Sequence, residues 1–518
     1  MTNQQGFVRV DQHTDFCRKL KHNTITDYLC PQFLGFDMRF IHPPAIIRIL
    51  STNLLIEVFV FLICVPVALV YHESTLPFIW PAIITLSFSA AFFLLSRKSS
   101  VRKINIREGF LSVAMSWVIF SLFGTLPYIF SRTIPRFTDA LFESTSGITT
   151  TGSTVIANVE ALPYSVNFYR ALTHWAGGLG IVLLVIIILP ELGISAHQLL
   201  RRESSIREKI VPKTKSVGFR LLFIYLALTA LQIILLSAGD MNLFESICHS
   251  FSTIATGGFS IKNTSMMGYS PYSQYIMAIF MLFGGISFVI YYHFIKLQFK
   301  KIGSNDEFWF YLAVILLSGT VATLILYGTT SDPFELSFRQ GFFQTISIIT
   351  TSGFTTTDYL NWPHAGTFLI FILLFSGAST GSTTGGIKMA RHLILIKSIR
   401  NVFIRLSHPS AVTQIKLHGN TLSEKSITSV FSFILIYIFL FISGTLLITL
   451  TGTDPVTSAS AVAASLGNTG PGLGTIGPMF TYSHMTDFNK IFFCILMITG
   501  RLEVNTLFIL LSRSFWKD

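Results

Sequence analysis

Long apolar segments separated by short polar loops run along nearly the whole chain. Segments such as LLIEVFVFLICVPVALVY and SITSVFSFILIYIFLFISGTLLITL approach the ~20 residues that a helix needs to cross a bilayer. Backbone groups in lipid must be satisfied within the same segment, so we interpret these runs as transmembrane helices. The predicted full spans lie at about 45–71, 78–96, 109–131, 168–190, 217–238, 272–295, 307–328, 365–405, 424–450 and 484–512.

Four shorter apolar segments interrupt this series. They read FTDALFESTSGI, NLFESICHSFSTI, LSFRQGFFQTISII and VTSASAVAASL, and each is too short to span a bilayer. Each leads directly into a small polar run, namely TTTGST, ATGGFS, TTSGFT or GNTGPG. We therefore predict four re-entrant half-helices, each followed by a polar loop.

The four polar loops share one glycine, which recurs roughly every 100 residues, an interval typical of a repeated structural unit. Aligned on that glycine, the loops read Thr150-Thr151-Gly152, Thr256-Gly257-Gly258, Thr351-Ser352-Gly353 and Asn468-Thr469-Gly470. The predicted fold is an all-α polytopic membrane protein with four pseudo-repeats around one pore. Each repeat contains a helix, a re-entrant pore loop and a second helix, and an extra helix pair precedes them.

The repeats also define the predicted domain boundaries. These are an N-terminal cytoplasmic tail (1–40), an extra transmembrane helix pair (41–100), and pore repeats 1 (101–200), 2 (201–300), 3 (301–420) and 4 (421–518). Repeat 3 is expected to include an intramembrane loop.

The chemistry of the polar loops favours contact with a small cation. Non-helical backbone at membrane depth is tolerated where it is buried in protein or lines water. Glycine permits backbone conformations that a Cβ would forbid, so a loop could turn its carbonyl oxygens toward a common axis. Such oxygens can replace the hydration shell of an alkali cation, and the half-helices would point their negative ends at it. Because the loops carry no charged side chain, binding would be weak enough for release. The fourth loop differs most, through Asn468 and Pro471.

Composition and charge narrow the class of protein. Hydrophobic residues make up 51% of the 518 residues and charged residues 12%, and mean hydropathy is +0.61. A soluble domain has about 25% charged residues, so a soluble enzyme is a poor fit. The net charge of +12 does not indicate nucleic-acid binding, because Lys and Arg gather in loops that alternate between spans. That bias marks cytoplasmic loops, and an even number of spans then places both termini in the cytoplasm.

Two further features lie inside predicted spans. The segment FSGASTGSTTGGIKMA interrupts the eighth span with small polar residues and would leave a flexible segment within the membrane. Arg501 lies in FFCILMITGRLEVNTLFILL, where a charge costs about 2.5–3.5 kcal/mol or more, so it is expected to face water or a partner.

Several motifs resemble one known family. FESTSGITTTGSTVI, THWAGGLGIVLL, FSTIATGGFS, TISIITTSGFTTTD, GASTGSTTGGIKMARHL, GNTGPGLG and GRLEVNTLFILL together are similar to the Trk/Ktr/HKT superfamily of potassium transporters, and most closely to its bacterial TrkH/TrkG branch. The resemblance covers the chain from about residue 40 to the end. It implies potassium as the transported ion, with no organic cofactor in this chain. Glycine in all four loops, including Gly152, accompanies potassium preference in this family.

The resemblance also implies roles for individual residues. The twelve aligned loop residues would form a selectivity filter. An intramembrane gating loop would lie beneath it, with Gly377, Gly381, Gly385, Gly386 and Lys388, and Arg501 would act as a barrier in the pore. Location in the bacterial inner membrane, a homodimer and a TrkA-like cytosolic nucleotide-binding regulatory subunit are implied as well. The basic loops near 200–216 and 400–425 are candidate docking surfaces for that subunit, or ordinary orientation signals.

Two alternatives remain beside a potassium-selective pore. One is a cation symporter that couples potassium to protons or sodium, which the four-loop pattern does not exclude. The other is an intramembrane serine hydrolase, suggested by GASTG, which fits the Gly-x-Ser-x-Gly nucleophile pattern. That pattern lies inside an apolar span and no histidine stands out as its base, so an enzyme is not expected.

Overall fold

The computed structural model describes residues 43–97, 106–183, 214–411, 413–512 and 515. Nearly all of them belong to one compact unit, His42–Leu511. The predicted N-terminal tail and the basic stretch 200–213 lie outside the described residues.

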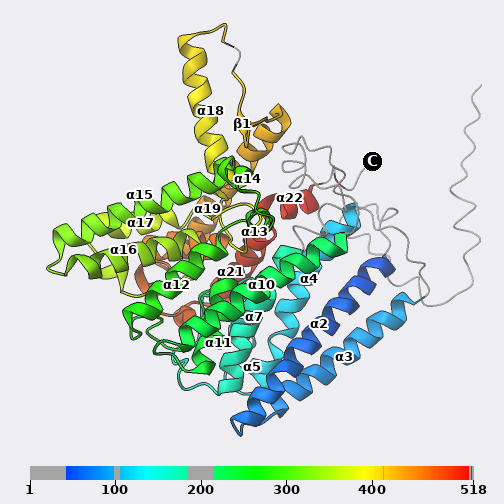
Figure 1. Ribbon diagram of the computed structural model, residues 1–518. Helices are drawn as coiled ribbons and strands as arrows, with labels where there is room; N and C mark the ends of the chain where they lie inside the picture. Colours follow the sequence, from blue (N-terminus) through cyan, green and yellow to red (C-terminus); the bar gives the residue numbers. More distant parts are fainter. Residues whose placement is uncertain (1–42, 98–105, 184–213, 412, 513–514, 516–518) are drawn as a thin grey trace, which may run out of the picture. The chain divides into compact units, whose positions relative to one another are not determined.

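The extra helix pair consists of α2 (Pro43–Val70) and α3 (Leu76–Ser96), which lie side by side (Figure 1). Ser51 Oγ donates to Ser89 O at 2.9 Å, and Ser89 Oγ donates to Ser51 O at 2.8 Å. These reciprocal bonds fix the two buried serine faces against each other. Both helices of the pair then contact repeat 1.

The first two repeats follow the predicted order of helix, half-helix, loop and helix. Repeat 1 contains α4 (Ile106–Phe123), α5 (Leu126–Phe130), α6 (Phe137–Ile148) and α7 (Tyr164–Leu183). Repeat 2 contains α10 (Thr214–Ser237), α11 (Leu243–Ile254), α12 (Pro271–Gly284), α13 (Phe288–Ile295) and α14 (Phe299–Gly303).

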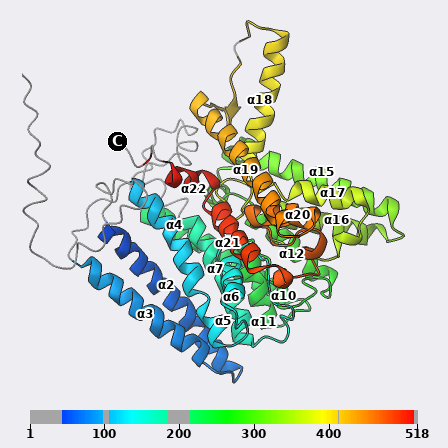
Figure 2. The same ribbon diagram turned by 180° about the vertical axis from the view of Figure 1, so that it is seen from behind.

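The last two repeats follow the same order. Repeat 3 contains α15 (Asp306–Thr329), α16 (Phe334–Ile349), η4 (Tyr359–Asn361), α17 (His364–Leu373), α18 (Met389–Ser407) and an antiparallel hairpin of β1 (Lys416–Leu417) and β2 (Asn420–Thr421). Repeat 4 contains α19 (Glu424–Leu450), α20 (Pro455–Gly467), η5 (Gly474–Ile476), η6 (Tyr482–His484), α21 (Asp487–Arg501) and α22 (Val504–Leu511). In Figure 2, α21 lies between α6 and α20, so repeat 4 closes against repeat 1.

The four half-helices α6, α11, α16 and α20 occur where the sequence predicts them. Their 12, 12, 16 and 13 residues are too few to span a bilayer. Their buried residues are mostly Ser, Thr, Ala and Gly, whereas Phe59, Leu317 and Leu435 on the long helices are 60% exposed or more. The centre is therefore polar and small, and the lipid-facing surface is apolar, as expected for a pore within a membrane.

The predicted spans are not all continuous. Six helices are long and apolar enough to cross a membrane, or seven if α12 and α13 count as one, among the described residues. The predicted span 272–295 is wrong as a straight helix, because α12 and α13 are bent by 95° at residues 285–287. The span 484–512 divides at Leu502 and Glu503, where Glu503 has a φ of 61°. The eighth span breaks between α17 and α18 where the small polar residues predict it.

Candidate functional site

The four polar loops have the same backbone conformation. The residue two positions before each shared glycine is left-handed, with φ of 53° at Thr150, 55° at Thr256, 51° at Thr351 and 54° at Asn468. The glycines Gly152, Gly258, Gly353 and Gly470 also have positive φ, at 84°, 83°, 75° and 97°. The middle residue of each loop, between the left-handed residue and the glycine, does not have a positive φ. Two left-handed residues with one residue between them take each loop out of the helical path of its half-helix in the same way, and glycine adopts such a φ without strain.

Each half-helix ends with the same bond into its loop. The N–H of the middle loop residue donates to the carbonyl five residues earlier, with Thr151 on Ser146 at 2.9 Å and Gly257 on Ser252 at 2.8 Å. The equivalent bonds join Ser352 to Ser347 at 2.8 Å and Thr469 to Ala464 at 2.9 Å. The sequence differences of the fourth loop therefore do not change its backbone.

The glycines reveal how the loops meet. A Cβ added to Gly152 would collide with the carbonyl oxygen of Gly257, and one added to Gly258 with that of Ser352. A Cβ on Gly353 would collide with the carbonyl oxygen of Thr469, and one on Gly470 with that of Thr151. Each loop thus backs onto the next in the order one, two, three, four and back to one. All twelve sequence-predicted loop residues form one closed ring, which we call the loop ring, and glycine is required because the backbones approach so closely.

The side chains break the fourfold pattern. Asn468 Nδ2 donates to Thr151 Oγ1 at 3.0 Å and to Met497 O at 2.9 Å. Loops one and three each have an internal hydrogen bond between two hydroxyls instead. In loop one it joins Thr149 and Thr151 at 2.8 Å, and in loop three it joins Thr350 and Ser352 at 2.9 Å. The expected asymmetry of the fourth loop is therefore found in its side-chain contacts.

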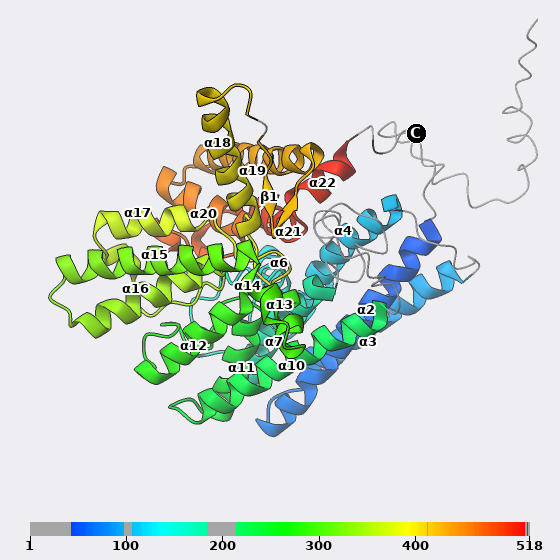
Figure 3. The same cartoon turned by 45° about the horizontal axis from the view of Figure 1, so that its top comes forward.

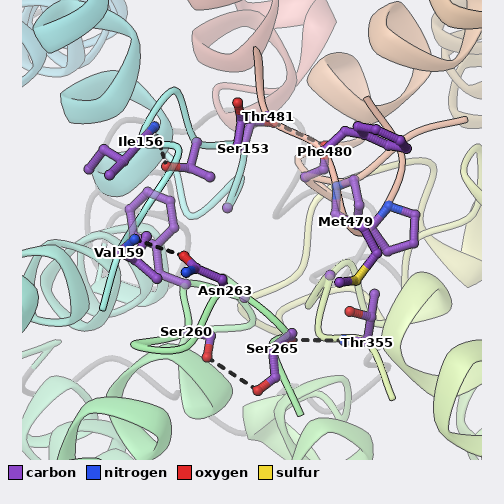
Figure 4. A pocket seen from close by; sticks show the side chains of 18 of the residues that line it. Ser153, Ile156, Val159, Ser260, Asn263, Ser265, Thr355, Met479, Phe480 and Thr481 are labelled. Atoms are coloured by element: carbon purple, nitrogen blue, oxygen red, sulfur yellow. Dashed lines mark hydrogen bonds between the residues drawn. The ribbon is translucent and has the colours of Figure 1, made fainter. Parts of the chain in front are cut away.

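One cavity of about 120 Å³ opens on one side of the loop ring, and all four shared glycines line it. Figure 4 shows residues of all four repeats around this cavity, among them Ser153, Asn263, Thr355 and Phe480, and we call it the outer cavity. Hydrogen bonds link neighbouring repeats there: Ser153 Oγ donates to Gly470 O at 3.0 Å, and Met266 N donates to Thr355 O at 2.9 Å.

Residues 374–388, which we call the intramembrane loop, contact the loop ring at the ends of its half-helices. Gly385 N donates to Thr351 Oγ1 at 2.9 Å, and Thr383 Oγ1 lies 3.2 Å from Thr256 Oγ1. A Cβ on Gly385 would collide with the carbonyl oxygen of Gly467, and one on Gly377 with the carbonyl oxygen of Gly385. The predicted gating glycines therefore lie on the side of the ring opposite the outer cavity.

Two buried cationic side chains bond to this loop: Arg501 of α21, and Lys388, which is the last residue of the loop. Arg501 is 3% exposed, and its Nη1 donates to Thr383 O at 2.6 Å while Nη2 donates to Gly177 O at 3.2 Å. Lys388 is 8% exposed and donates to Thr384 O and, at 2.9 Å, to Thr384 Oγ1. Both of these cationic side chains thus donate to carbonyl groups of the intramembrane loop, on the side of the ring away from the cavity.

The sequence analysis missed an acidic partner of the same loop. Glu307, in the first turn of α15, is 5% exposed, and its Oε1 accepts from Thr380 N at 2.5 Å and from Ala390 N at 3.1 Å. One carboxylate oxygen therefore ties the middle of the loop to the first turn of α18, which follows it. Its position after Asn305 and Asp306 gave no signal, because acidic residues are ordinary in a first helical turn.

The neighbouring residue connects α15 to the hairpin. Asp306 forms an ion pair with Lys397 at 2.7 Å, and Lys397 Nζ also donates to Lys416 O at 2.8 Å, where β1 lies beside α18 (Figure 3). Asp306 N donates to His418 Nδ1 at 3.1 Å. Burial is the main reason why the pKa of His418 lies below its usual value, which keeps this nitrogen free to accept.

The Gly-x-Ser-x-Gly pattern does not form a nucleophile site. Ser379 lies in the intramembrane loop, and its Oγ has no hydrogen-bond partner among the described residues. A serine nucleophile needs an adjacent base to accept its proton.

Comparisons with known proteins agree with one another. The sequence model of the family described as "TrkH: Cation transport protein" matches residues 78–326 and 330–517. The Trk system potassium uptake protein TrkH of Escherichia coli (strain K12) is 36% identical over 489 residues, which cover 92% of this chain and 100% of that protein. The Trk system potassium uptake protein TrkG of the same strain is 33% identical, over 87% of this chain and 94% of that protein.

A solved structure shares the fold. The crystal structure of the potassium transporter TrkH from Vibrio parahaemolyticus matches with a TM-score of 0.83 and 34% identity. The match covers 92% of this chain and 100% of that chain.

Proposed function

Because the chain belongs to the TrkH family of cation transport proteins, we propose that it takes up potassium through the loop ring, with the intramembrane loop as its gate. The chain is a multi-pass membrane protein, and it is a transporter, not an enzyme. The observation that carries the proposal is the closed order of the ring, in which each glycine lies against the carbonyl of the next loop.

The ring can supply what a dehydrated cation needs. Backbone carbonyls and the hydroxyls of Thr150, Thr151 and Thr351 are oxygen donors, and none of the twelve residues is charged. Rings of such oxygens replace the hydration shell and bind weakly enough for the ion to leave. The C-terminal ends of α6, α11, α16 and α20 all lead into the ring, so their dipoles add negative potential there.

The side of the loop ring that faces the intramembrane loop carries positively charged side chains. Arg501 and Lys388 place positive charge against the intramembrane loop, which would oppose a cation that leaves the ring inward. We propose that conduction requires this loop to move, and that Arg501 is the electrostatic barrier of the closed state.

Membership of the TrkH family also supports proposals for the protein's location and partners. We propose a bacterial inner-membrane location with both termini in the cytoplasm, a homodimer, and a TrkA-like nucleotide-binding partner at the cytoplasmic face. Residues 400–411 and 413–425 belong to the expected docking surface, and the second of these ranges contains the β1–β2 hairpin.

The test is potassium uptake in cells that lack their own potassium systems, with wild type and Gly353→Ser at equal membrane abundance. Gly353 has a φ of 75° and no room for a Cβ, whereas the control Gly328→Ser changes a glycine with nothing within 4 Å. We expect wild type and Gly328→Ser to restore growth at low potassium. Gly353→Ser should lower the potassium-to-sodium uptake ratio by roughly tenfold, as expected when one strained backbone position shifts. An unchanged ratio would mean that TTSGF is only a turn.

A further inference from the structure

One buried ion pair lies directly behind the loop ring. Glu143 in α6 and Arg170 in α7 meet at 2.9 Å, with side chains that are 0% and 2% exposed. Taking two charges out of water is costly, and an apolar pair of similar size often stabilises a fold as well. The pair therefore calls for an explanation beyond stability.

The contacts of the pair point to the ring. Glu143 accepts from Thr154 Oγ1 and from Val155 N, each at 3.0 Å. These residues follow Gly152 by two and three positions, so Glu143 holds the exit segment of loop one. Arg170 Nη1 donates to Ser260 O at 3.2 Å. Ser260 follows Gly258 by two positions and belongs to the exit segment of loop two. The guanidinium also lies over the ring of Phe259 at 4.2 Å. The pair thus spans the boundary between loops one and two.

The other three repeats show what this position can be. Nine residues before the shared glycine, where repeat 1 has Glu143, the other repeats have His249, Gln344 and Ala461. His249 Nε2 lies 3.1 Å from Ser260 Oγ, and its Nδ1 must carry the proton because it lies 2.9 Å from Glu245 O, which can only accept. Gln344 Oε1 accepts from Thr356 N at 3.3 Å, and Ala461 is a buried methyl.

This comparison separates folding from positioning. Repeats 2, 3 and 4 form the same half-helix and the same loop backbone with a neutral residue at this position. A charge is therefore not needed to fold a repeat. What repeat 1 gains is a guanidinium that reaches across to Ser260 O, two residues from the shared glycine of loop two. The other bonds between the two exit segments lie farther from the ring, where Asn263 pairs with Val159 and Glu160.

We propose that Glu143 and Arg170 are positioning residues for selectivity, which fix the spacing of loops one and two and so the size of that quarter of the ring. The proposal rests on the proposed function of the ring as the selectivity filter. The pair touches no ion. It acts through Thr154, Val155 and Ser260, each within three residues of a ring glycine, so a small displacement there changes the distance between facing carbonyl groups.

The decisive variant is Glu143→Gln together with Arg170→Gln, which removes both charges and leaves no lone charge buried. The matched control is Arg136→Gln with Asp487→Asn, an ion pair at 3.1 Å whose side chains are 64% and 49% exposed. Both are assayed after reconstitution into liposomes, for potassium and sodium uptake rates, KM for potassium and thermal unfolding in detergent. Gly353→Ser is measured alongside.

We expect the potassium-to-sodium ratio of the double variant to fall by about tenfold, the change that follows from loss of one charge-assisted hydrogen bond. The control pair should keep the wild-type ratio. Arg170→Lys should give an intermediate ratio, because a lysine ammonium keeps the charge beside Glu143 but lacks the second donor arm that reaches Ser260.

The outcomes distinguish the two claims. A wild-type ratio in the double variant, with Gly353→Ser impaired, would overturn the positioning role and leave the filter intact. If neither variant changes the ratio, the proposed function itself fails. Should the double variant not reach the membrane, Arg170→Lys decides: a wild-type ratio there contradicts the proposal, and a lowered ratio at wild-type unfolding temperature supports it.

Discussion

The loop ring and the intramembrane loop are built mainly from the same residue types, Gly, Ser and Thr, but different contacts hold them. The ring is made of four copies, and each is held by backbone bonds from its own half-helix and by close contact with the next copy. The intramembrane loop exists once, in repeat 3. Backbone bonds join it to the bend between α12 and α13, and charged side chains hold it as well: Glu307 at Thr380 and Ala390, with Lys388 and Arg501 against its carbonyls.

This difference indicates a division of labour. Backbone contacts repeated four times leave little freedom, which suits oxygens that must keep a fixed spacing around a cation. The intramembrane loop has no second copy of itself to pack against, and each of its ionic contacts is a point where its position can be changed. Under the proposed function, selectivity depends on the repeated part and gating on the unique part. Each of the following changes tests one side of that division.

The largest effect is expected where the ring itself is broken. Gly258→Ala places a Cβ at a φ of 83° against the carbonyl oxygen of Ser352. Strain of this kind costs about 1–3 kcal/mol, so potassium uptake should fall by up to about a hundredfold and the potassium-to-sodium ratio should change with it. Gly268→Ala, in the same repeat with nothing within 4 Å, is the control and should transport normally. Equal uptake by the two variants would contradict the tight ring.

A smaller effect of opposite sign is expected for Arg501→Gln. The amide can still donate to Thr383 O or Gly177 O, but the positive charge is gone. The maximal uptake rate should rise by about tenfold, or 1.4 kcal/mol of barrier, while the potassium-to-sodium ratio stays at the wild-type value. Flux of a potassium tracer into liposomes measures both quantities. A lowered ratio would show that Arg501 also positions the ring.

The next change releases the loop without touching the ring. In Glu307→Gln the charge that accepts from Thr380 N and Ala390 N is replaced by a neutral carbonyl oxygen, which weakens each bond by roughly half. Uptake should rise about threefold with KM for potassium unchanged, since only the population of the open loop shifts. The adjacent Asp306→Asn removes a partly exposed ion pair with Lys397 and serves as control. If both variants raise uptake alike, the clamp does not act through Glu307.

The sequence predicted the parts that repeat. The half-helices and the positions of the loops follow from short apolar segments that end in small polar runs, and the fourfold period made a chance pattern improbable. The order of the loops around the ring did not follow, because it depends on which backbone lies against which glycine. Such contacts between distant residues leave no periodic signal in a single sequence.

The bend between α12 and α13 shows why a continuous span was the wrong prediction. FMLFGGISFVIYY has the apolar composition of a straight helix. The intramembrane loop supplies the bonds that the helix gives up, with Ser379 N donating to Gly285 O and Phe288 N donating to Gly381 O, both at 3.1 Å. A helix breaks inside a membrane only where such replacements exist, and they come from residues almost 100 positions away.

The smallest effect is expected at the end of a half-helix that lies far from the ring. Asn242 caps α11, with its Oδ1 accepting from Glu245 N at 2.8 Å while Glu245 Oε2 accepts from Asn242 N at 3.1 Å. Asn242→Ala removes one of these bonds and should lower the free energy of unfolding by about 1 kcal/mol, seen as a slightly lower unfolding temperature in detergent. The end of α11 at the loop ring is fixed separately, by the bond from Gly257 N to Ser252 O and by contact with loop three. Transport rate and potassium-to-sodium ratio should therefore stay at wild-type values. A changed ratio would mean that the ring depends on the whole half-helix, and that its four-copy contacts do not fix its geometry alone.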